Sequence, residues 1–337
     1  MAYIRFENIC KSFGKNEVLK NINLDVEKGQ LVTLLGPSGC GKSTLLRCLA
    51  GLETVTSGKV YLDGNDITNV NPKDRDIGMV FQQYSLFPNM TVEQNVAFGL
   101  KMKKVDKSKI QTKVRDIVEI VGLGDKMRHY PSQLSGGQQQ RAALARAIVT
   151  EPKVLLLDEP LSAIDALLRH SLQIEIRRIQ KELNITAIFV THDQDEALTL
   201  SDRIAVFNKG KIEQVGTPDE LYNKAETEYV CNFIGDVSKL SGEVIRLINE
   251  ELGETRFHPD AASYIRQERI ETDRLSPDAV AMEAKVLERE FYGTHSIYTS
   301  GILDSTIKGY VKECGGMPYQ PGEVIRVYIN PRDILQY

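Results

Sequence analysis

The amino-acid sequence predicts an α/β P-loop fold followed by a small all-β domain. A glycine-rich loop at 36–44 stands between an apolar, β-prone run and a run of apolar residues at helical spacing. From there to about residue 214, short apolar strands alternate with helices, which is typical of a mostly parallel sheet covered on both faces. Past about residue 235, short alternating strands separated by turns indicate a β-barrel or sandwich.

Composition sets the number of domains and excludes several classes of protein. The chain has 337 residues, a net charge of −4 and a hydrophobic fraction of 42%, which suit two globular domains, placed here at 1–235 and 236–337. The five cysteines are scattered without a C-x-x-C pair, as in a reducing compartment. No signal peptide or apolar run of about eighteen residues is present. We expect a cytosolic protein unless a partner tethers it, and no nucleic-acid binding, which usually requires a strongly basic surface.

The glycine-rich loop fits the P-loop NTPase pattern G-x-x-x-x-G-K-[ST]. Its glycines let the backbone wrap closely round a phosphate, and the N–H groups at the start of a helix favour an anion. Lys42 supplies a charge for the β- and γ-phosphates, and the Ser43 hydroxyl can reach Mg²⁺. A chance glycine-rich turn would not need the flanking strand and helix. We therefore expect ATP to contact Gly36, Pro37, Ser38, Gly39, Cys40, Gly41, Lys42, Ser43 and Thr44.

The first part of the chain alternates between the two kinds of element. Thr91 and Gln94 form a predicted capping box that opens a helical insertion, a subdomain at about 88–150. A helix is also expected between the last two parallel strands, and a hairpin at 203–214 closes this part. The expected strands are 3–9, 22–26, 31–35, 58–64, 77–81, 154–157 and 185–190 in the first part, and 242–248, 284–288, 295–301, 306–311 and 324–329 in the second.

Two carboxylates end the apolar strand at 154–157. Asp158 lies at a strand end beside the phosphate loop, where it can hold Mg²⁺, usually through its waters. Glu159 points elsewhere and could take the proton of an attacking water. An ordinary acidic pair at the end of a strand is the alternative, which the neighbouring phosphate loop disfavours.

A second phosphate-directed surface is predicted at 134–141. Ser135 and two glycines open an alanine-rich helix and leave bare N–H donors at its positive end. A turn followed by a helix cap would explain the serine, but not both glycines and the glutamine.

The run Leu134–Gln138 is similar to the LSGGQ signature of ATP-binding-cassette (ABC) ATPases, and other motifs of that family follow in order. The resemblance covers residues 3 to about 235. It implies ATP contacts from Ser135, Gly136, Gly137 and Gln138, adenine stacking on Phe13, a Q-loop glutamine at Gln82 that touches Mg²⁺ and water, a D-loop dimer contact at Asp165, and a switch histidine at His192. Ile164 stands where the D-loop usually has leucine. For Phe13 and His192, an ordinary residue at a strand end remains the alternative.

The C-terminal part resembles the transport-associated OB-like (TOBE) domain of ATPase subunits from importers of the maltose, polyamine, ferric-iron and phosphonate type. It carries Ile265-Arg266-Gln267-Glu268 where those proteins usually have R-P-E, then Tyr292-Gly293 and a Val-Tyr-Ile-Asn-Pro run from Val327. The run Tyr84-Ser85-Leu86-Phe87-Pro88 also looks like that group. Tyr84, Leu86, Phe87 and Pro88 are apolar in a loop and need a surface to cover, either the core or, as the resemblance implies, a helix of each membrane subunit.

The resemblance implies an ATPase that energises import, with Glu159 as general base and Lys42, Gln82 and His192 as its catalytic partners. The implied partners are a second copy in a head-to-tail dimer, two membrane-spanning permease subunits and an extracytoplasmic solute-binding protein, at the cytoplasmic face of the membrane. Polyamine, ferric iron or phosphonate is favoured over sugar as the solute. The alternatives are an ABC ATPase acting on nucleic acid or the ribosome, and an exporter half. The single cassette, the lack of coiled-coil heptads and the lack of fused membrane spans disfavour them.

Overall fold

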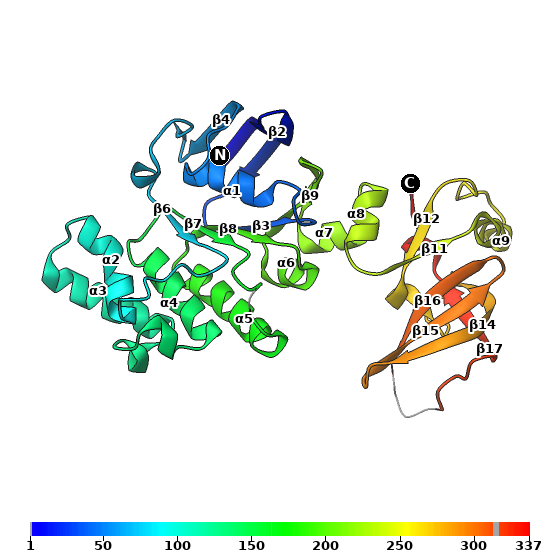
Figure 1. Cartoon of the computed structure of the whole chain (residues 1–337). Coiled ribbons are helices and arrows are strands. Elements are labelled where there is room, and N and C mark those ends of the chain that lie inside the picture. The colour runs from blue at the N-terminus through cyan, green and yellow to red at the C-terminus, as the bar shows by residue number, and fades with distance from the viewer. Residues whose placement is uncertain (1, 163, 313–316) are drawn as a thin grey trace. The chain divides into compact units, whose positions relative to one another are not determined.

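The structure is a computed structural model that describes residues 2–162, 164–312 and 317–337. By its internal contacts the chain divides into two compact units, Met1–Pro218 and Asp219–Tyr337 (Figure 1). Among the described residues, no helix combines the length and apolar character needed to cross a bilayer.

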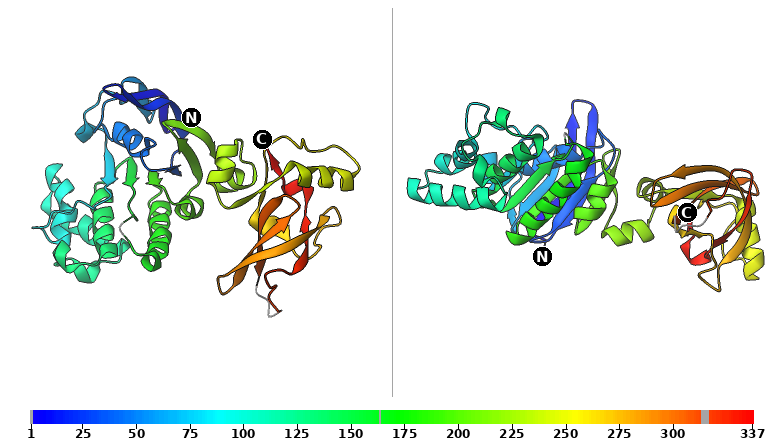
Figure 2. Two further views of the ribbon diagram at one scale, coloured as in Figure 1. Left: turned by 45° about the vertical axis from the view of Figure 1, so that its right-hand side comes forward. Right: turned by 90° about the horizontal axis from the view of Figure 1, so that it is seen from below.

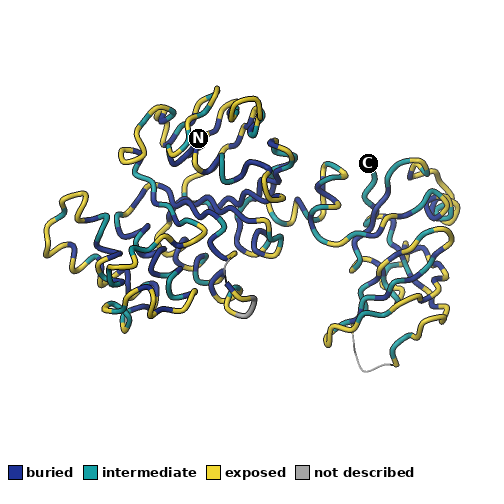
Figure 3. The backbone as a smooth tube through the Cα atoms, viewed as in Figure 1, coloured by how far each residue is buried: buried dark blue, intermediate teal, exposed yellow. Residues whose placement is uncertain are grey.

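The first unit is built on a six-stranded sheet with the strand order β10-β9-β3-β8-β7-β6. Its strands are β3 (Leu31–Leu35), β6 (Ile77–Val80), β7 (Val154–Asp158), β8 (Thr186–Thr191), β9 (Arg203–Asn208) and β10 (Lys211–Gly216). All neighbours run parallel except β10, which forms an antiparallel hairpin with β9. Every residue of β3, β7 and β8 is buried, as Figure 3 shows for the centre of this unit. The predicted mostly parallel sheet is confirmed.

A separate antiparallel sheet covers α1 (Lys42–Ala50), the helix that follows the phosphate loop. It contains β1 (Ile4–Phe13), β2 (Asn16–Val26), β4 (Ser57–Leu62) and β5 (Asn65–Asp66). Leu45, Leu46 and Leu49 of α1 share one hydrophobic core with residues of β1 and of the central sheet. The helix therefore lies between two sheets, as Figures 1 and 2 show. The sequence indicated β1, β4 and the second part of β2, but neither β5 nor the second sheet that these strands form.

The other face of the central sheet is covered by helices. α2 (Val92–Met102), α3 (Lys107–Ile120) and α4 (Gly136–Ile148) form the helical insertion, while α5 (Ala166–Glu182) and α6 (Gln194–Leu200) follow β7 and β8. The capping box is present: Thr91 Oγ1 accepts a hydrogen bond from Gln94 N, and Gln94 Oε1 accepts one from Thr91 N. Val96, Val118 and Leu144 of the insertion share one core with residues of β3, β7 and β8.

The second unit is a small antiparallel β structure. β13 (Ile270–Glu271), β17 (Val324–Ile329), β14 (Val280–Phe291), β15 (His295–Ile302) and β16 (Ser305–Lys312) form one sheet in that order. β13 also contacts β16, so the sheet is nearly closed into a barrel. β11 (Val237–Leu240), β12 (Ser263–Arg266) and β18 (Leu335–Gln336) form a second sheet. This arrangement is consistent with the expected OB-like domain.

The strand predicted at 242–248 is wrong. These residues belong to the helix α9 (Gly242–Leu252). Val244, Ile245 and Ile248 are buried, a spacing that fits a helix because positions three and four residues apart share a helical face. Ser241 caps its N-terminus by accepting from Val244 N, and Gly253 ends it with a φ of 69°.

The division between the two compact units falls after Pro218, earlier in the sequence than the boundary predicted at 235. The buried Arg266 donates to the carbonyl oxygens of Tyr222 and Ile234, which holds the helices α7 (Pro218–Asn223) and α8 (Glu228–Phe233) to β12. Tyr337 Oη also donates to Ala225 O at 2.9 Å. Residues 219–235 therefore pack with the second unit.

Candidate nucleotide-binding site

The phosphate loop connects β3 to α1 in a conformation that requires glycine. Gly41, the N-cap of α1, has a φ of 108°, and a Cβ there would lie 2.8 Å from Leu19 Cδ2 and 3.0 Å from Val18 O. Lys42 is buried, and its Nζ donates to Gly36 O at 2.6 Å and to Pro37 O at 2.8 Å. The lysine is thus held inside the loop that is expected to surround the phosphates. Residues 37–39 at the tip of the loop are exposed.

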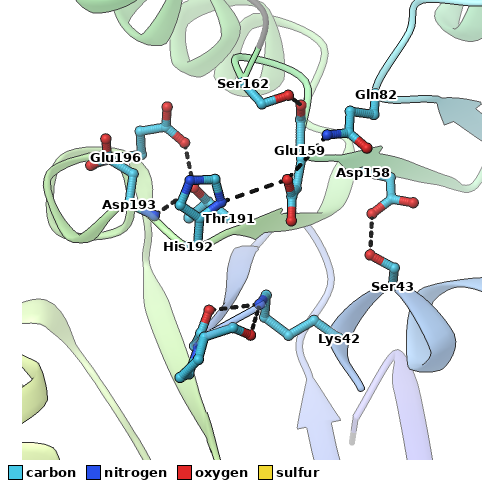
Figure 4. Close-up of polar contacts among 12 residues, drawn as sticks. Lys42, Ser43, Gln82, Asp158, Glu159, Ser162, Thr191, His192, Asp193 and Glu196 are labelled. Carbon is cyan, nitrogen blue, oxygen red and sulfur yellow. Dashed lines mark hydrogen bonds and ion pairs between the residues drawn. The ribbon is translucent and has the colours of Figure 1, made fainter. Parts of the chain in front are cut away.

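A hydroxyl and a carboxylate meet where α1 starts and β7 ends. Ser43 Oγ donates to Asp158 Oδ1 at 2.6 Å (Figure 4), and Arg47 Nη2 lies 3.8 Å from Asp158 Oδ2. Oxygen ligands of this kind suit Mg²⁺, which keeps several waters and takes one or two protein oxygens beside phosphate. Two of the three residues predicted for the metal, Ser43 and Asp158, therefore lie together, and the third is Gln82.

Three predicted catalytic side chains meet at the ends of neighbouring parallel strands. Gln82 follows β6, Glu159 follows β7 and His192 follows β8. Gln82 Nε2 donates to Glu159 Oε2 at 3.4 Å, and His192 Nδ1 lies 3.6 Å from the same oxygen (Figure 4). The carboxyl ends of parallel strands meet at one edge of a sheet, which is where α/β proteins bind ligands. The Glu159 side chain is 19% exposed, which leaves it accessible to a water.

A second layer of contacts, which the sequence did not indicate, surrounds this group. Arg169 of α5 lies 3.2 Å from Asp193 Oδ2 and donates to Ile164 O at 3.1 Å. Thr191 Oγ1 donates to Glu196 Oε2 at 2.6 Å. Burial raises the pKa of Glu196, the bond from Thr191 opposes this, and the nearby Asp193 raises the pKa further. No motif marks these residues, because their partners come from different elements.

The signature residues lie at the start of α4. Ser135 Oγ accepts from Gln138 N, and Gln138 Oε1 accepts from Ser135 N, which forms a capping box. Ser135 and Gly136 are exposed, and Gly137 is buried against Leu172. α4 packs on α2, α3 and β6, whereas α1 packs on β2, β7 and β8. The signature and the phosphate loop are therefore carried by different parts of the unit.

Phe13 and Asp165 are both at accessible positions. Phe13 ends β1 with 47% of its surface exposed, and Lys11 Nζ lies 4.6 Å from the centre of its ring. Asp165 caps α5 by accepting a hydrogen bond from Leu168 N at 3.1 Å. Of the expected D-loop, Ala163 lies outside the described residues.

The apolar segment at 84–88 is divided between core and surface. Tyr84 is buried in the core that the helical insertion shares with the central sheet, and Leu86 packs against that core. Phe87 is partly buried, and its ring packs at a tilt against that of Phe98, with the ring centres 4.6 Å apart, while Pro88 is exposed. Arg146 of α4 donates to Tyr84 O at 3.0 Å and to Ser85 O at 2.7 Å. Core burial therefore accounts for Tyr84, but not for all of Phe87 or for Pro88.

Comparisons with known proteins agree with these motifs. A family model described as ABC transporter matches residues 19–162. A spermidine/putrescine import ATP-binding protein of Thermobifida fusca is 46% identical over 323 residues, 90% of this chain and 84% of that protein. A sulfate/thiosulfate import ATP-binding protein of Thermosynechococcus vestitus is 52% identical over 246 residues, 72% of each chain.

A solved structure similar to this chain is also an ATP-binding cassette. It is the dimer of an ATP-binding cassette in a post-hydrolysis state, bound to ADP and Pi, and it matches with a TM-score of 0.57 and 31% sequence identity. The match covers 64% of this chain and 98% of that one. The chain therefore belongs to the ABC transporter family, as a nucleotide-binding, ATP-hydrolysing subunit of an importer.

Proposed function

We propose that this ATPase subunit drives the import of a polyamine such as spermidine or putrescine. The observation that carries the proposal is the extent of similarity to polyamine import proteins: 46% identity across 90% of the chain for the Thermobifida fusca protein, and 45% across 92% for one from Haemophilus influenzae. These matches include most of the second unit. They favour polyamine over the other solutes that the sequence left open.

Sulfate or thiosulfate is the second candidate. The relative from Thermosynechococcus vestitus is more nearly identical, at 52%, but over 72% of this chain. A high identity within an ATPase core reports the chemistry of ATP rather than the choice of solute, since one fold serves many functions. For this reason the longer matches weigh more.

Within the site, we propose that Lys42 and the phosphate loop hold the β- and γ-phosphates, with Ser43, Gln82 and Asp158 toward Mg²⁺. When bound, Mg²⁺ neutralises charge that develops on the transferring phosphoryl group. Glu159 accepts the proton of the attacking water, and Gln82 and His192, both within 3.6 Å of its carboxylate, position that water and the γ-phosphate. For the adenine, the proposed platform is Phe13, which is half exposed.

We further propose that two copies join head to tail, so that each ATP lies between the phosphate loop of one and Ser135, Gly136, Gly137 and Gln138 of the other. The dimeric relative in complex with ADP and Pi and the exposed Ser135 and Gly136 of the signature support this. The dimer would bind two permease subunits at the cytoplasmic face of the membrane through the segment 84–88, and an extracytoplasmic protein would deliver the solute. No nucleic acid is expected to take part.

Uptake by the assembled transporter tests the proposed solute. The chain would be co-expressed with the permease and binding-protein genes that neighbour its own, and reconstituted into liposomes containing ATP. We expect uptake of labelled spermidine or putrescine that requires ATP and is lost with Lys42→Ala. ATP-dependent uptake of labelled sulfate, with none of polyamine, would instead support the second candidate.

A further inference from the structure

We propose that Arg169 is a positioning residue that couples the D-loop segment to the loop carrying His192. Among the described residues, its side chain bonds or pairs with Ile164, Asp193 and Glu196. The inference depends on the proposed roles of Glu159 and His192 in hydrolysis. It adds a residue that makes the geometry of those side chains depend on the segment at 161–165.

The guanidinium of Arg169 bridges two segments. Its Nη2 donates to Ile164 O at 3.1 Å, and its Nη1 lies 3.2 Å from Asp193 Oδ2. Asp193 directly follows His192, and its backbone N donates to Thr191 Oγ1 at 3.0 Å. Both side chains of the ion pair are about 30% exposed, at 32% and 28%, so solvent and salt screen the pair less than they would at the surface. A shift of Ile164 would thus reach the residue next to His192 through one rigid, planar group.

The bridge completes a ring of contacts round the proposed base. Ser162 Oγ donates to Glu159 O at 2.9 Å, and the carboxylate of Glu159 faces His192. His192 is followed in the sequence by Asp193, which pairs with Arg169. Arg169 in turn donates to Ile164 O, and Ile164 lies two residues after Ser162 in the sequence. Figure 4 shows the side of this ring that includes Ser162, Glu159, His192 and Asp193. Ser162 therefore contacts the proposed base directly, and Ile164 reaches the switch loop through Arg169.

Arg169 lies near the start of a helix, a position that is unfavourable for a cation unless other contacts compensate. The residue lies in the first turns of α5, where Arg169 N donates to Asp165 O at 3.0 Å. The N-terminal end of a helix carries a partial positive charge, which disfavours a cation there. The pair with Asp193 and the bond to Ile164 O offset this cost.

One donor of Arg169 remains unused. Within the part of the chain that the structure describes, its Nε is buried without a hydrogen-bond partner, and it lies 3.9 Å from Glu196 Oε1. An unsatisfied buried donor costs free energy, so a small displacement of the guanidinium toward Glu196 would be favourable. Glu196 is itself only 4% exposed and is held by Thr191. The guanidinium therefore has a second arrangement within reach, as a coupling element requires.

Steady-state ATP hydrolysis by the full chain tests the proposal. We expect Arg169→Ala to lower kcat about tenfold or more and to change KM for ATP less than about twofold. Asp193→Ser, which keeps a side-chain acceptor for Glu196 N but is too short to reach Arg169, should lower kcat similarly. If the two residues act through their mutual contact, the double variant should be no slower than the slower single variant.

Arg178→Ala is the matched control. Arg178 lies on the same helix and also makes one ion pair, with Glu182 at 2.6 Å, and one bond to a backbone carbonyl, Ile120 O at 2.7 Å. It should lower the melting temperature about as much as Arg169→Ala while leaving kcat within about twofold of wild type.

Three results would overturn the proposal: an unchanged kcat for Arg169→Ala, effects of the two single variants that multiply in the double variant, or an equal loss of kcat in the control. Glu159→Gln, assayed beside these variants, distinguishes this from failure of the proposed catalytic roles, which would appear as normal turnover in Glu159→Gln itself.

Discussion

Glu159 lies between two side chains that can hold a water in line with a phosphate. Gln82 Nε2 and His192 Nδ1 are 3.4 Å and 3.6 Å from its Oε2, while Lys42 and Ser43 have other partners. The proposed general base is thus separate from the residues that would hold the phosphates. Substitutions should be able to remove proton transfer and keep nucleotide binding.

We therefore expect Glu159→Gln to bind ATP normally and to hydrolyse it roughly a few hundredfold more slowly, corresponding to the loss of about 3–4 kcal/mol of transition-state stabilisation. The variant should also stall as an ATP-bound dimer. Fluorescent-nucleotide binding, phosphate release and light scattering measure these quantities. Glu182→Gln, which alters an exposed pair with Arg178, is the control. Near-normal turnover in Glu159→Gln would assign the base to another residue.

Asp202 makes a contribution to the free energy of unfolding that depends on pH. Burial opposes its charge, but hydrogen bonds from Arg177 at 2.5 and 3.0 Å and from Leu31 N at 2.8 Å outweigh burial and lower the pKa of Asp202 to about 2. Because the folded pKa is below the unfolded one, this stability is complete above about pH 4 and is lost as the pH falls toward 2.

Asp202→Asn should therefore lower the free energy of unfolding by about 1–2 kcal/mol at pH 7, discounted for the partial exposure of the group. The difference from wild type should shrink between about pH 4 and pH 2, where the wild-type carboxylate becomes protonated. Urea unfolding of the two proteins at several pH values measures it. A difference that persists unchanged at pH 3 would show that the ion pair is not its origin.

Sequence reasoning at this scale found the residues that belong to motifs and missed those that support them. The phosphate loop, Asp158 and Glu159 are each marked by neighbours in the chain. Arg169 and Glu196 are not, because their partners lie on other elements and an arginine on an amphipathic helix normally faces solvent.

At the scale of elements, the segment 84–88, which follows β6, combines a contact with the core and an exposed end. Asn95 of α2 holds it by accepting from Phe87 N at 2.8 Å and donating to Phe87 O and Met90 O. Arg146 holds it from α4 and lies over the ring of Phe87 at 5.6 Å. Its backbone is therefore fixed by two helices of the insertion, while Pro88 and part of Phe87 remain available to a partner.

From this we expect Phe87→Ala to leave ATP binding intact and to weaken attachment to the permease subunits, or to uncouple hydrolysis from uptake. A large apolar side chain buried in a partner contributes roughly 1.5–3 kcal/mol. Co-purification and transport per ATP hydrolysed measure the two effects. Tyr84→Ala is the contrasting variant, because Tyr84 is buried in the core and its loss should destabilise the fold by about 3 kcal/mol. Normal assembly of a folded Phe87→Ala protein would contradict the coupling role.

The helix α9 shows why one element was predicted wrongly. The run from Gly242 to Ile248 contains apolar residues at spacings that fit both a strand and a helix, and short apolar runs do not separate the two. The decisive signals were at its ends, Ser241 as a cap and Gly253 with a φ of 69°. By contrast, α2 was predicted correctly because Thr91 and Gln94 stand in the sequence as a recognisable pair.

For the whole molecule, the two compact units could be predicted, but their division could not be placed. The sequence pattern changes near Gly235, where helices give way to strands. The contacts change earlier, because Arg266 binds carbonyl groups of Tyr222 and Ile234. That arginine belongs to the run Ile265–Glu268, which the resemblance marked, although what it holds is visible only in the folded chain.

If each ATP site is shared between two copies, two inactive variants should restore activity to one another. Lys42→Ala damages one phosphate loop, and Ser135→Arg blocks one signature. In a mixed head-to-tail dimer both defects fall at one site, and the other site is intact. Equal mixing should then recover up to about a quarter of the wild-type rate, from random pairing of a two-fold dimer. ATPase assays of the mixture, compared with each variant alone, measure this recovery, and its absence would argue against shared sites.

The helix α4 has a consequence for how a signal could cross the subunit. Its first residues are the signature, and Arg146 in its last turn grips the backbone of Tyr84 and Ser85. Thirteen helical residues span about 20 Å, and the alanines between the two ends are mostly buried. If α4 moves as one rigid body, a partner that binds at one end tilts the other end without any relay of side chains. Substitutions in the middle of α4 should then leave its two ends moving together. Communication should fail only on substitution of the residues at the ends, the signature and Arg146.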